Sequence, residues 1–405
     1  MLRVEQTNTM KKLLKSSMLC IFSFTLFLST VSWAQLGDVT NSLTYLGSPT
    51  TGQYPDNTEL VYARNVWTLK AWAGGPYAPR IYMGSGNANN AAPAINAGPV
   101  YIRTFTPSTG LFGVENAGVA IEEEEIQTLQ DIGGNLFIPG IDPTSGVTGA
   151  YYSLSPGSGW STHTNIPNQY HVYDLIQSIP GGDLIAAGAG VYDGQYHSGL
   201  QRTTDGTTWV SMTCSDDGCL YYRFYRLFWL AGKLYASSRL GLYEYQAPTH
   251  WVKLSAAIDT AMLPGFSINY RVSSQLAWAG GLAYLVSPTL DDHHTEPKYL
   301  MFSSVMGAAT NVPLPSSALK PRGLLVIGST LYLLQNGNTG DFWSVVYKTT
   351  DLVNWSPVLY FKTLPGSGFA RSFEYYNGYF YFGMGTYAGQ LSNVSGQLAR
   401  IAFTP

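Results

Sequence analysis

A unit of about fifty residues recurs along the chain and restricts the fold more than any other feature of the sequence. Each copy has an apolar strand, a glycine turn and a second strand of the form Leu-Tyr or its equivalent. Seven such units are present, each long enough for four short strands, and this is typical of a β-propeller. The turns start near Gly74, Gly133, Gly181, Gly232, Gly280, Gly328 and Gly378, at steps of 48 to 51 residues after the second copy.

The ends of the repeat array predict how the ring closes. The last unit supplies three strands, near residues 371–376, 379–383 and 397–403. A single blade cannot bury both faces of its sheet, so the blades must stack around an axis and close. We expect residues 42–46 to supply the missing strand. The prediction is an all-β, seven-bladed propeller of four-stranded antiparallel blades, closed by an N-terminal strand in the last blade.

Polar turns that end in tryptophan give a second periodic signal. The clearest are Thr203-Thr204-Asp205-Gly206-Thr207-Thr208-Trp209 and residues 349–355, which run from Thr349 through Asp351 to Trp355. An Asp here can accept backbone N–H bonds across the turn while the Trp packs between sheets. The motif resembles the Asp-box of secreted, sialidase-like propellers, although residues 203–209 are one residue shorter than the usual Ser-x-Asp-x-Gly-x-Thr-Trp. The resemblance covers the whole mature chain and implies architecture, not an activity.

The N-terminus has the pattern of an export signal. Lys11, Lys12 and Lys15 precede an apolar run over residues 18–28, and Ser32-Trp33-Ala34 ends with small residues at the expected spacing. We predict a signal peptide over residues 1–34, too short for a comfortable membrane span, followed by one propeller domain over residues 35–405. An uncleaved anchor is the alternative. Cleavage leaves an exported protein, extracellular or periplasmic.

Two cysteines remain after the predicted cleavage. Cys214 and Cys219 enclose the turn sequence Ser-Asp-Asp-Gly, which can bring their side chains together. In an oxidising compartment we expect them to form a disulfide, with two surface thiols as the alternative. Zinc is disfavoured, because no second cysteine pair is present.

The composition excludes some partners. Only 12% of residues are charged and the net charge is −3, so the chain has no basic footprint of the kind a nucleic-acid binder needs. We expect a monomer with no nucleic-acid partner. In a chain so poor in charge, the placement of its cations is informative.

Arginines gather at the predicted starts of the inner strands. In a propeller, these starts converge on one face of the central channel. Arginine side chains at these positions could bind carboxylate or sulfate groups bidentately. The alternative is that each pairs with a neighbouring acid or carbonyl. The predicted ligand-binding residues are Arg223, Arg226, Arg271, Arg322 and Arg371, together with Trp67.

One inner strand adds residues that could act in acid–base chemistry. His171 and Tyr173 share one face of residues 170–175, and a neutral His can act as a base. With Tyr225 or Tyr222 as proton donor, and an Arg on a uronate carboxylate, the set would suffice for β-elimination. It looks like the set of β-propeller polysaccharide lyases such as the ulvan lyases, but no motif matches residue by residue. A hydrogen-bonded structural His is the alternative.

Two acidic segments are weaker candidates. Asp291, Asp292, His293 and His294 could bind a divalent cation, but no ligand spacing rule is met and a solvated loop is favoured. We therefore predict no cofactor. Residues 122–125 are four consecutive glutamates, a pattern that usually marks a solvated edge; the alternative is that Glu124 or Glu125 faces the arginines or acts as a general acid.

Three functions fit these patterns. The first is a secreted propeller that recognises an anionic polysaccharide and could cleave it by β-elimination. The second is a non-catalytic binding scaffold that uses the same channel. The third is a sialidase-type glycoside hydrolase, in which Arg271, Arg322 and Arg371 would form the arginine triad.

Overall fold

The structure is a computed structural model. It describes residues 37–49, 65–74, 79–86, 98–144, 149–189, 191–192, 195–263, 271–287, 297–337, 343–363, 368–386 and 394–405. The chain divides into two units, Met1–Gly37 and Asp38–Pro405, and every described strand belongs to the second. The predicted signal peptide lies outside the described residues.

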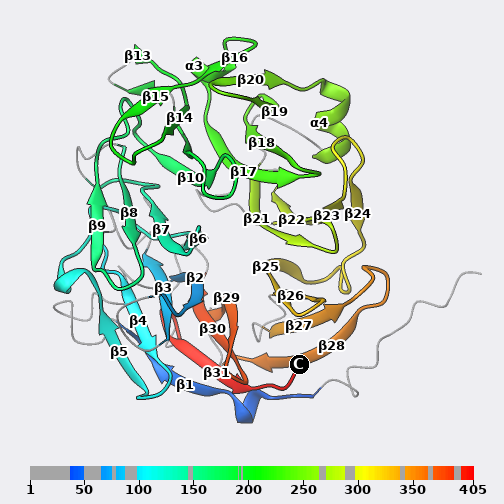
Figure 1. Ribbon diagram of the computed structural model, residues 1–405. Coiled ribbons are helices and arrows are strands. Elements are labelled where there is room, and N and C mark those ends of the chain that lie inside the picture. Colours follow the sequence, from blue (N-terminus) through cyan, green and yellow to red (C-terminus); the bar gives the residue numbers. More distant parts are fainter. Residues whose placement is uncertain are drawn as a thin grey trace, which may run out of the picture. The chain divides into compact units, whose positions relative to one another are not determined.

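Asp38–Pro405 forms a ring of seven antiparallel four-stranded blades, as the repeat predicts (Figure 1). The first three blades are β2 (Asn65–Trp72), β3 (Arg80–Gly86), β4 (Arg103–Thr106) and β5 (Leu111–Val114); β6 (Gln130–Ile132), β7 (Asn135–Pro139), β8 (Tyr151–Leu154) and β9 (Trp160–His163); and β10 (Val172–Gln177), β11 (Leu184–Gly188), β14 (Leu200–Thr203) and β15 (Trp209–Ser211).

The next three blades follow the same order. They are β17 (Phe224–Leu230), β18 (Lys233–Ser238), β19 (Gly241–Gln246) and β20 (His250–Lys253); β21 (Arg271–Trp278), β22 (Gly281–Ser287), β23 (Tyr299–Ser303) and β24 (Thr310–Val312); and β25 (Lys320–Ile327), β26 (Thr330–Gly337), β27 (Trp343–Thr349) and β28 (Ser356–Lys362). In each of these six blades, the strand that comes first in the chain lies nearest the centre of the ring (Figure 1).

The seventh sheet has the order β1-β31-β30-β29, with β1 (Thr44–Gly47), β29 (Gly368–Tyr376), β30 (Tyr379–Thr386) and β31 (Leu398–Ala402). In it, β1 pairs antiparallel with β31, and Thr44 lies opposite Arg400. The remaining elements are η2 (Thr40–Ser42), η4 (Asn116–Gly118), β12 (Val191–Tyr192), β13 (Gln195–Tyr196), β16 (Thr213–Cys214), α3 (Gly218–Tyr221) and α4 (Ala256–Met262).

The polar turns form as the sequence indicates. Asp205 Oδ1 accepts N–H bonds from Thr207 (2.8 Å) and Thr208 (2.6 Å), and Asp351 Oδ1 accepts the equivalent bonds from Val353 (2.9 Å) and Asn354 (2.7 Å). These backbone bonds hold the pKa of both carboxyls below the usual value. The predicted role of the turns in the scaffold is confirmed.

The turn tryptophan joins neighbouring blades. Trp209 packs edge-on against Tyr151 of the preceding blade, with ring centroids 5.8 Å apart, and its indole N–H donates to Asn165 Oδ1. Aromatic pairs of this kind stabilise a fold by about 0.5–1.5 kcal/mol beyond their buried area.

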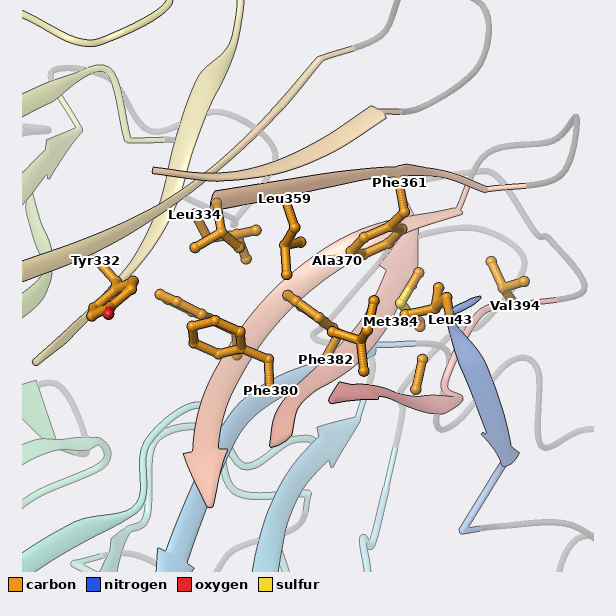
Figure 2. Packing of buried hydrophobic residues seen from close by; sticks show 14 residues of the cluster. Leu43, Tyr332, Leu334, Leu359, Phe361, Ala370, Phe380, Phe382, Met384 and Val394 are labelled. Carbon is orange, nitrogen blue, oxygen red and sulfur yellow. The ribbon is translucent and has the colours of Figure 1, made fainter. Parts of the chain in front are cut away.

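The core lies between the blades. Between the sixth and seventh, Phe380 and Phe382 of β30 pack against Leu334, Leu359 and Phe361, as Figure 2 shows. Full burial of each such side chain contributes about 1.5–3 kcal/mol. The large faces of the blades are therefore the main source of stability, as expected for a stacked repeat.

The predicted disulfide is present between Cys214 and Cys219. It links β16 to the start of α3, and β16 adds a parallel fifth strand to β20. Tyr243 of the same blade donates its hydroxyl to Asp216 within this segment (3.2 Å). The disulfide and this bond fix an irregular segment on a regular sheet.

Candidate functional site

A polar cavity of about 500 Å³ lies between the inner strands, within the usual range for ligand sites. All seven blades contribute to its wall. Its charged lining residues are Lys70, Asp174, Arg226, Arg322, Arg371 and Glu374, and its polar ones include Thr68, Gln127, Thr128, Gln130, Ser273, Ser274, Gln275 and Ser372.

The inner strands share an irregularity that the repeat pattern does not predict. In six of the seven blades, the pairing of the inner strand with its neighbour slips by one residue at the same place. Such β-bulges bend a strand and re-aim its side chains. The residues at the slips are Trp67, Tyr173, Tyr225, Ser273, Arg322 and Arg371. Five of these six are predicted site residues, so the bulges place them at one level around the ring.

Arg371 of β29 contacts several neutral groups at the cavity. Its Nε donates to Asn65 Oδ1 (2.9 Å) and its Nη2 to the Thr386 carbonyl (2.8 Å). Its guanidinium lies over the Trp67 ring, 4.1 Å from the centroid. These contacts orient the guanidinium, and none of them carries a negative charge.

Arg322 of β25 is held in a similar way. Its Nε donates to Asn336 Oδ1 (2.7 Å), and its guanidinium lies over the Phe369 ring, 4.8 Å from the centroid. Strands β2, β25 and β29 are neighbours in the ring (Figure 1), so Trp67, Arg322 and Arg371 form one cationic side of the cavity.

Arg226 also lines the cavity, but its contacts differ. Its three guanidinium nitrogens donate to the carbonyls of Tyr173, Val272 and Ser273, each at 3.3 Å, and Nη1 lies 3.9 Å from Asp174 Oδ1. These bonds join the third, fourth and fifth blades. Arg226 therefore joins blades, and its predicted role in ligand binding stays a prediction.

Asp174 completes this second side. Its side chain is 1% exposed, and burial raises the pKa of the carboxyl, while Arg226 and the Leu227 N–H oppose the rise. Its Oδ2 accepts the Leu227 N–H of the next inner strand at 2.7 Å. The carboxyl of Asp174 in β10 thus accepts a backbone N–H from β17. This bond joins the third and fourth blades near the axis of the ring.

A second acid lies on the cationic side. Glu374 Oε1 accepts the Tyr375 N–H (2.9 Å) and Oε2 accepts the Ala71 N–H of the next blade (3.3 Å). Burial raises the pKa of this carboxyl, and Lys70 opposes the rise. Because Oε2 bonds the backbone of β2, Glu374 also joins two blades.

The proposed acid–base residues lie together in one aromatic cluster. His171 stacks on Tyr173 with centroids 5.5 Å apart, and Tyr173 contacts Tyr225 at 5.2 Å. The two tyrosines are 8% and 4% exposed and pack with Ile141 and Ala189. His171 Nδ1 bonds the Ile141 carbonyl at 2.5 Å. Of the described residues that line the cavity, none is a His or a Tyr.

The other two arginines are placed only by their backbone. Arg223 pairs with Ala189 of the preceding blade and accepts the Arg239 N–H on its carbonyl. Arg271 begins β21 opposite Ser287, and its side chain is not among those the structure describes. Neither is among the residues described along the cavity wall.

The expectation of a solvated glutamate run is wrong for three of its four residues. Glu123, Glu124 and Glu125 are buried, because this segment passes between the first two blades and pairs Glu125 with Gly86. Burial raises the pKa of Glu123 well above its usual value, and the Asp142 N–H and the Tyr152 hydroxyl oppose the rise. Four like charges in a row indicate exposure only when no neighbouring element covers them.

The proposed cation loop, Asp291 to His294, lies outside the described residues. Elsewhere, in the part of the chain that is described, no group of three or more His, Cys, Asp or Glu could hold a metal ion. No described helix has the length and apolar character to cross a bilayer.

Apart from Trp67, the residues that hold the arginines are not among the predicted site residues. Asn65 and Asn336 are both 1% exposed, and Phe369 lies two residues before Arg371 on β29. Asn65 and Phe369 each lie two residues before a slip. In other blades the same position is occupied by His171 and Arg223. A systematic comparison of that position across the repeats would have found Asn65 and Phe369, whereas Asn336 is on the second strand and gives no periodic signal.

No protein-family model matches the chain, and no curated protein matches it. Three solved chains are similar in shape. They are YCF48 from Cyanidioschyzon merolae (TM-score 0.45, 9% identity, 84% of this chain and 96% of that chain), a chain from an analysis of two prolyl endopeptidases (0.43, 12%, 80% and 47%), and one of the mitotic checkpoint complex (0.46, 7%, 85% and 92%).

These likenesses are too remote to indicate a family or an activity. The β-propeller class of this protein rests on its own seven sheets. Membership of the Asp-box, sialidase-like propellers stays a prediction from residues 203–209 and 349–355.

Proposed function

We propose that this β-propeller binds an anionic glycan in its central cavity. The observation that carries the proposal is the pair Arg322 and Arg371, which line the cavity and are oriented by neutral partners. Oriented guanidinium groups suit carboxylate and sulfate groups, which they can bind bidentately.

The rest of the wall favours a hydroxylated ligand. Thr68, Ser273, Ser274 and Gln127 add hydroxyl and amide groups around the same space, and such groups exchange hydrogen bonds with sugar hydroxyls. Trp67 supplies an aromatic surface of the kind that packs against a sugar ring. An acidic sugar combines both demands.

We propose binding and not cleavage. β-Elimination needs a base and a proton donor beside the bound uronate, and the candidates His171, Tyr173 and Tyr225 pack in a cluster that is not part of the described cavity wall. A sialidase-type reaction would need Arg271 beside Arg322 and Arg371, and the side chain of Arg271 lies outside the described residues. The other arginine described at the cavity is Arg226, whose nitrogens bond carbonyls.

Binding to polysaccharides of different charge tests the proposal. Affinity electrophoresis of the protein is run against polygalacturonate, alginate, dextran sulfate and neutral dextran. We expect retardation by at least one acidic polymer, none by neutral dextran, and a loss of retardation with added salt, since salt screens charge pairs.

Two variants locate the interaction. Arg371→Gln is expected to reduce retardation at least tenfold, whereas Arg202→Gln, which removes a charge that pairs with Asp183 outside the cavity, is expected to leave it unchanged. Equal retardation by neutral dextran, or equal loss in both variants, would contradict the proposal.

A further inference from the structure

The cationic side of the cavity is an ordered array and not two separate arginines. Phe369 lies between the two guanidinium groups, 4.8 Å from that of Arg322 and 5.1 Å from that of Arg371. Trp67 covers Arg371 at 4.1 Å. Aromatic rings and cations thus alternate from β2 through β29 to β25, and the two guanidinium carbons are no farther apart than their two distances to Phe369 combined.

Each arginine is also held by a buried asparagine through the same atom. Asn65 Oδ1 accepts from Arg371 Nε and from the Thr386 N–H (2.9 Å each). Asn336 Oδ1 accepts from Arg322 Nε, while its Nδ2 donates to the Ala370 carbonyl (2.6 Å). A bond at Nε fixes the plane of a guanidinium, and Arg371 is fixed further by the bond from its Nη2 to the Thr386 carbonyl.

The backbone makes room for this arrangement. A side chain at Gly385 would clash with Asn65 Oδ1 and would come within 3.0 Å of Arg371 Nε. The glycine therefore allows the asparagine and the arginine to occupy the space beside β30.

From this array we infer that the cavity takes a ligand with two anionic groups, one for each arginine. The ligand class is a segment of acidic polysaccharide with anions on adjacent sugars. The inference rests on the proposed function and adds that a single anion is not enough. Both guanidinium groups are already ordered, so a ligand that reaches both gains the second charge pair at little further cost in side-chain entropy.

The experiment compares ligands of equal size that differ by one charge. Titration calorimetry of the whole protein uses digalacturonate and its monomethyl ester, and a disulfated disaccharide with its monosulfated counterpart. We expect one diacid to bind at least tenfold more tightly than its monoanionic partner. In Arg322→Gln and in Arg371→Gln, the ratio is expected to fall to about one. Arg202→Gln is the control for charge, and a thermal melt of each variant reports folding.

The outcomes separate the two proposals. If the diacid and the monoanion bind the unchanged protein equally, and Arg371→Gln weakens both, a single anion is recognised; the two-anion inference is then wrong and the proposed function stands. If neither member of either pair binds, and no acidic polymer retards the protein, both proposals fail. If an arginine variant melts like the parent and keeps the preference for the diacid, the array is not the recognition element.

Discussion

The two sides of the central cavity use the same residue type for different purposes. On the side formed by β10 and β17, Arg226 lies 3.9 Å from the buried carboxylate of Asp174 and bonds carbonyls of the two neighbouring blades. On the side formed by β2, β25 and β29, Arg322 and Arg371 bond asparagine oxygens and lie over aromatic rings.

The difference teaches that partners, not position alone, decide what a cavity arginine does. Arg226 carries its charge next to a compensating charge, and its nitrogens bond backbone, so it holds the inner edges of three blades together. The bonds of Arg322 and Arg371 to asparagine oxygens orient each guanidinium at the cavity. The first arrangement stabilises the fold, and the second is suited to recognition.

The largest effect should come from breaking the structural side. Arg226→Met leaves Asp174 buried beside an apolar group, and loss of one partner of a buried ion pair typically costs about 3–5 kcal/mol. Arg371→Met loses two hydrogen bonds and a ring contact, about 1–2 kcal/mol. Urea unfolding of both variants measures the difference. Similar losses of free energy of unfolding would mean that the two sides do not differ.

The next effect is steric and falls on the recognition side. Gly385→Ala places a Cβ against Asn65 Oδ1, so the pair Asn65 and Arg371 must shift, at a cost of about 1–3 kcal/mol in stability. Binding of an acidic saccharide should fall together with stability. Gly323→Ala is the control, because its Cβ would meet only the edge of Phe373, at 3.2 Å. Normal binding by Gly385→Ala would show that the asparagine does not set the position of Arg371.

The fold could be predicted from the sequence, and the partners of the site residues could not. The fifty-residue period arises because each blade repeats the same strands and turns, and a periodic pattern is visible without coordinates. The position of Arg322 and Arg371 on inner strands follows from the same period. The slip in six of the seven inner strands does not, since a bulge changes the pairing and leaves the hydrophobic pattern almost intact.

The sequence also does not predict which polar residues are buried between blades. Asp174 reads as a polar residue in an apolar strand, and Glu123 as part of a charged run, yet both are buried because a neighbouring blade covers them. Which blade residue meets which depends on ring packing, and local sequence does not encode it.

The buried carboxyls of Asp174 and Glu123 should affect the pH dependence of stability differently. Asp174 has a cation beside it, whereas the stabilising partners of Glu123 are the neutral Asp142 N–H and Tyr152 hydroxyl. Burial raises the pKa of Glu123 well above 4.5, so above that pH the unfolded chain loses a proton that the folded protein keeps. The contribution of Glu123 is complete below about pH 4.5 and declines as pH rises, by up to about 1.4 kcal/mol per pH unit.

Glu123→Gln should remove this decline. Urea unfolding between about pH 4.5 and 7 is expected to give a flatter profile in the variant than in the parent. Glu122→Gln is the matched control, because Glu122 is exposed and bonds Thr144. The same flattening in both variants would assign the pH dependence to general charge and not to burial.

The smallest effect is expected from replacing Phe369, whose aromatic ring lies between Arg322 and Arg371. Phe369→Leu keeps an apolar side chain and removes the aromatic face that both guanidinium groups share. A cation over an aromatic ring contributes about 0.5–1 kcal/mol at sites of moderate exposure, so the affinity for a dianionic saccharide should fall about two- to fivefold in calorimetry. Phe373→Leu is the control on the same strand, because Phe373 also lines the cavity but packs on Phe380. If the two variants weaken binding equally, Phe369 acts only as core packing, and the ordering of the arginines must come from Asn65 and Asn336 alone.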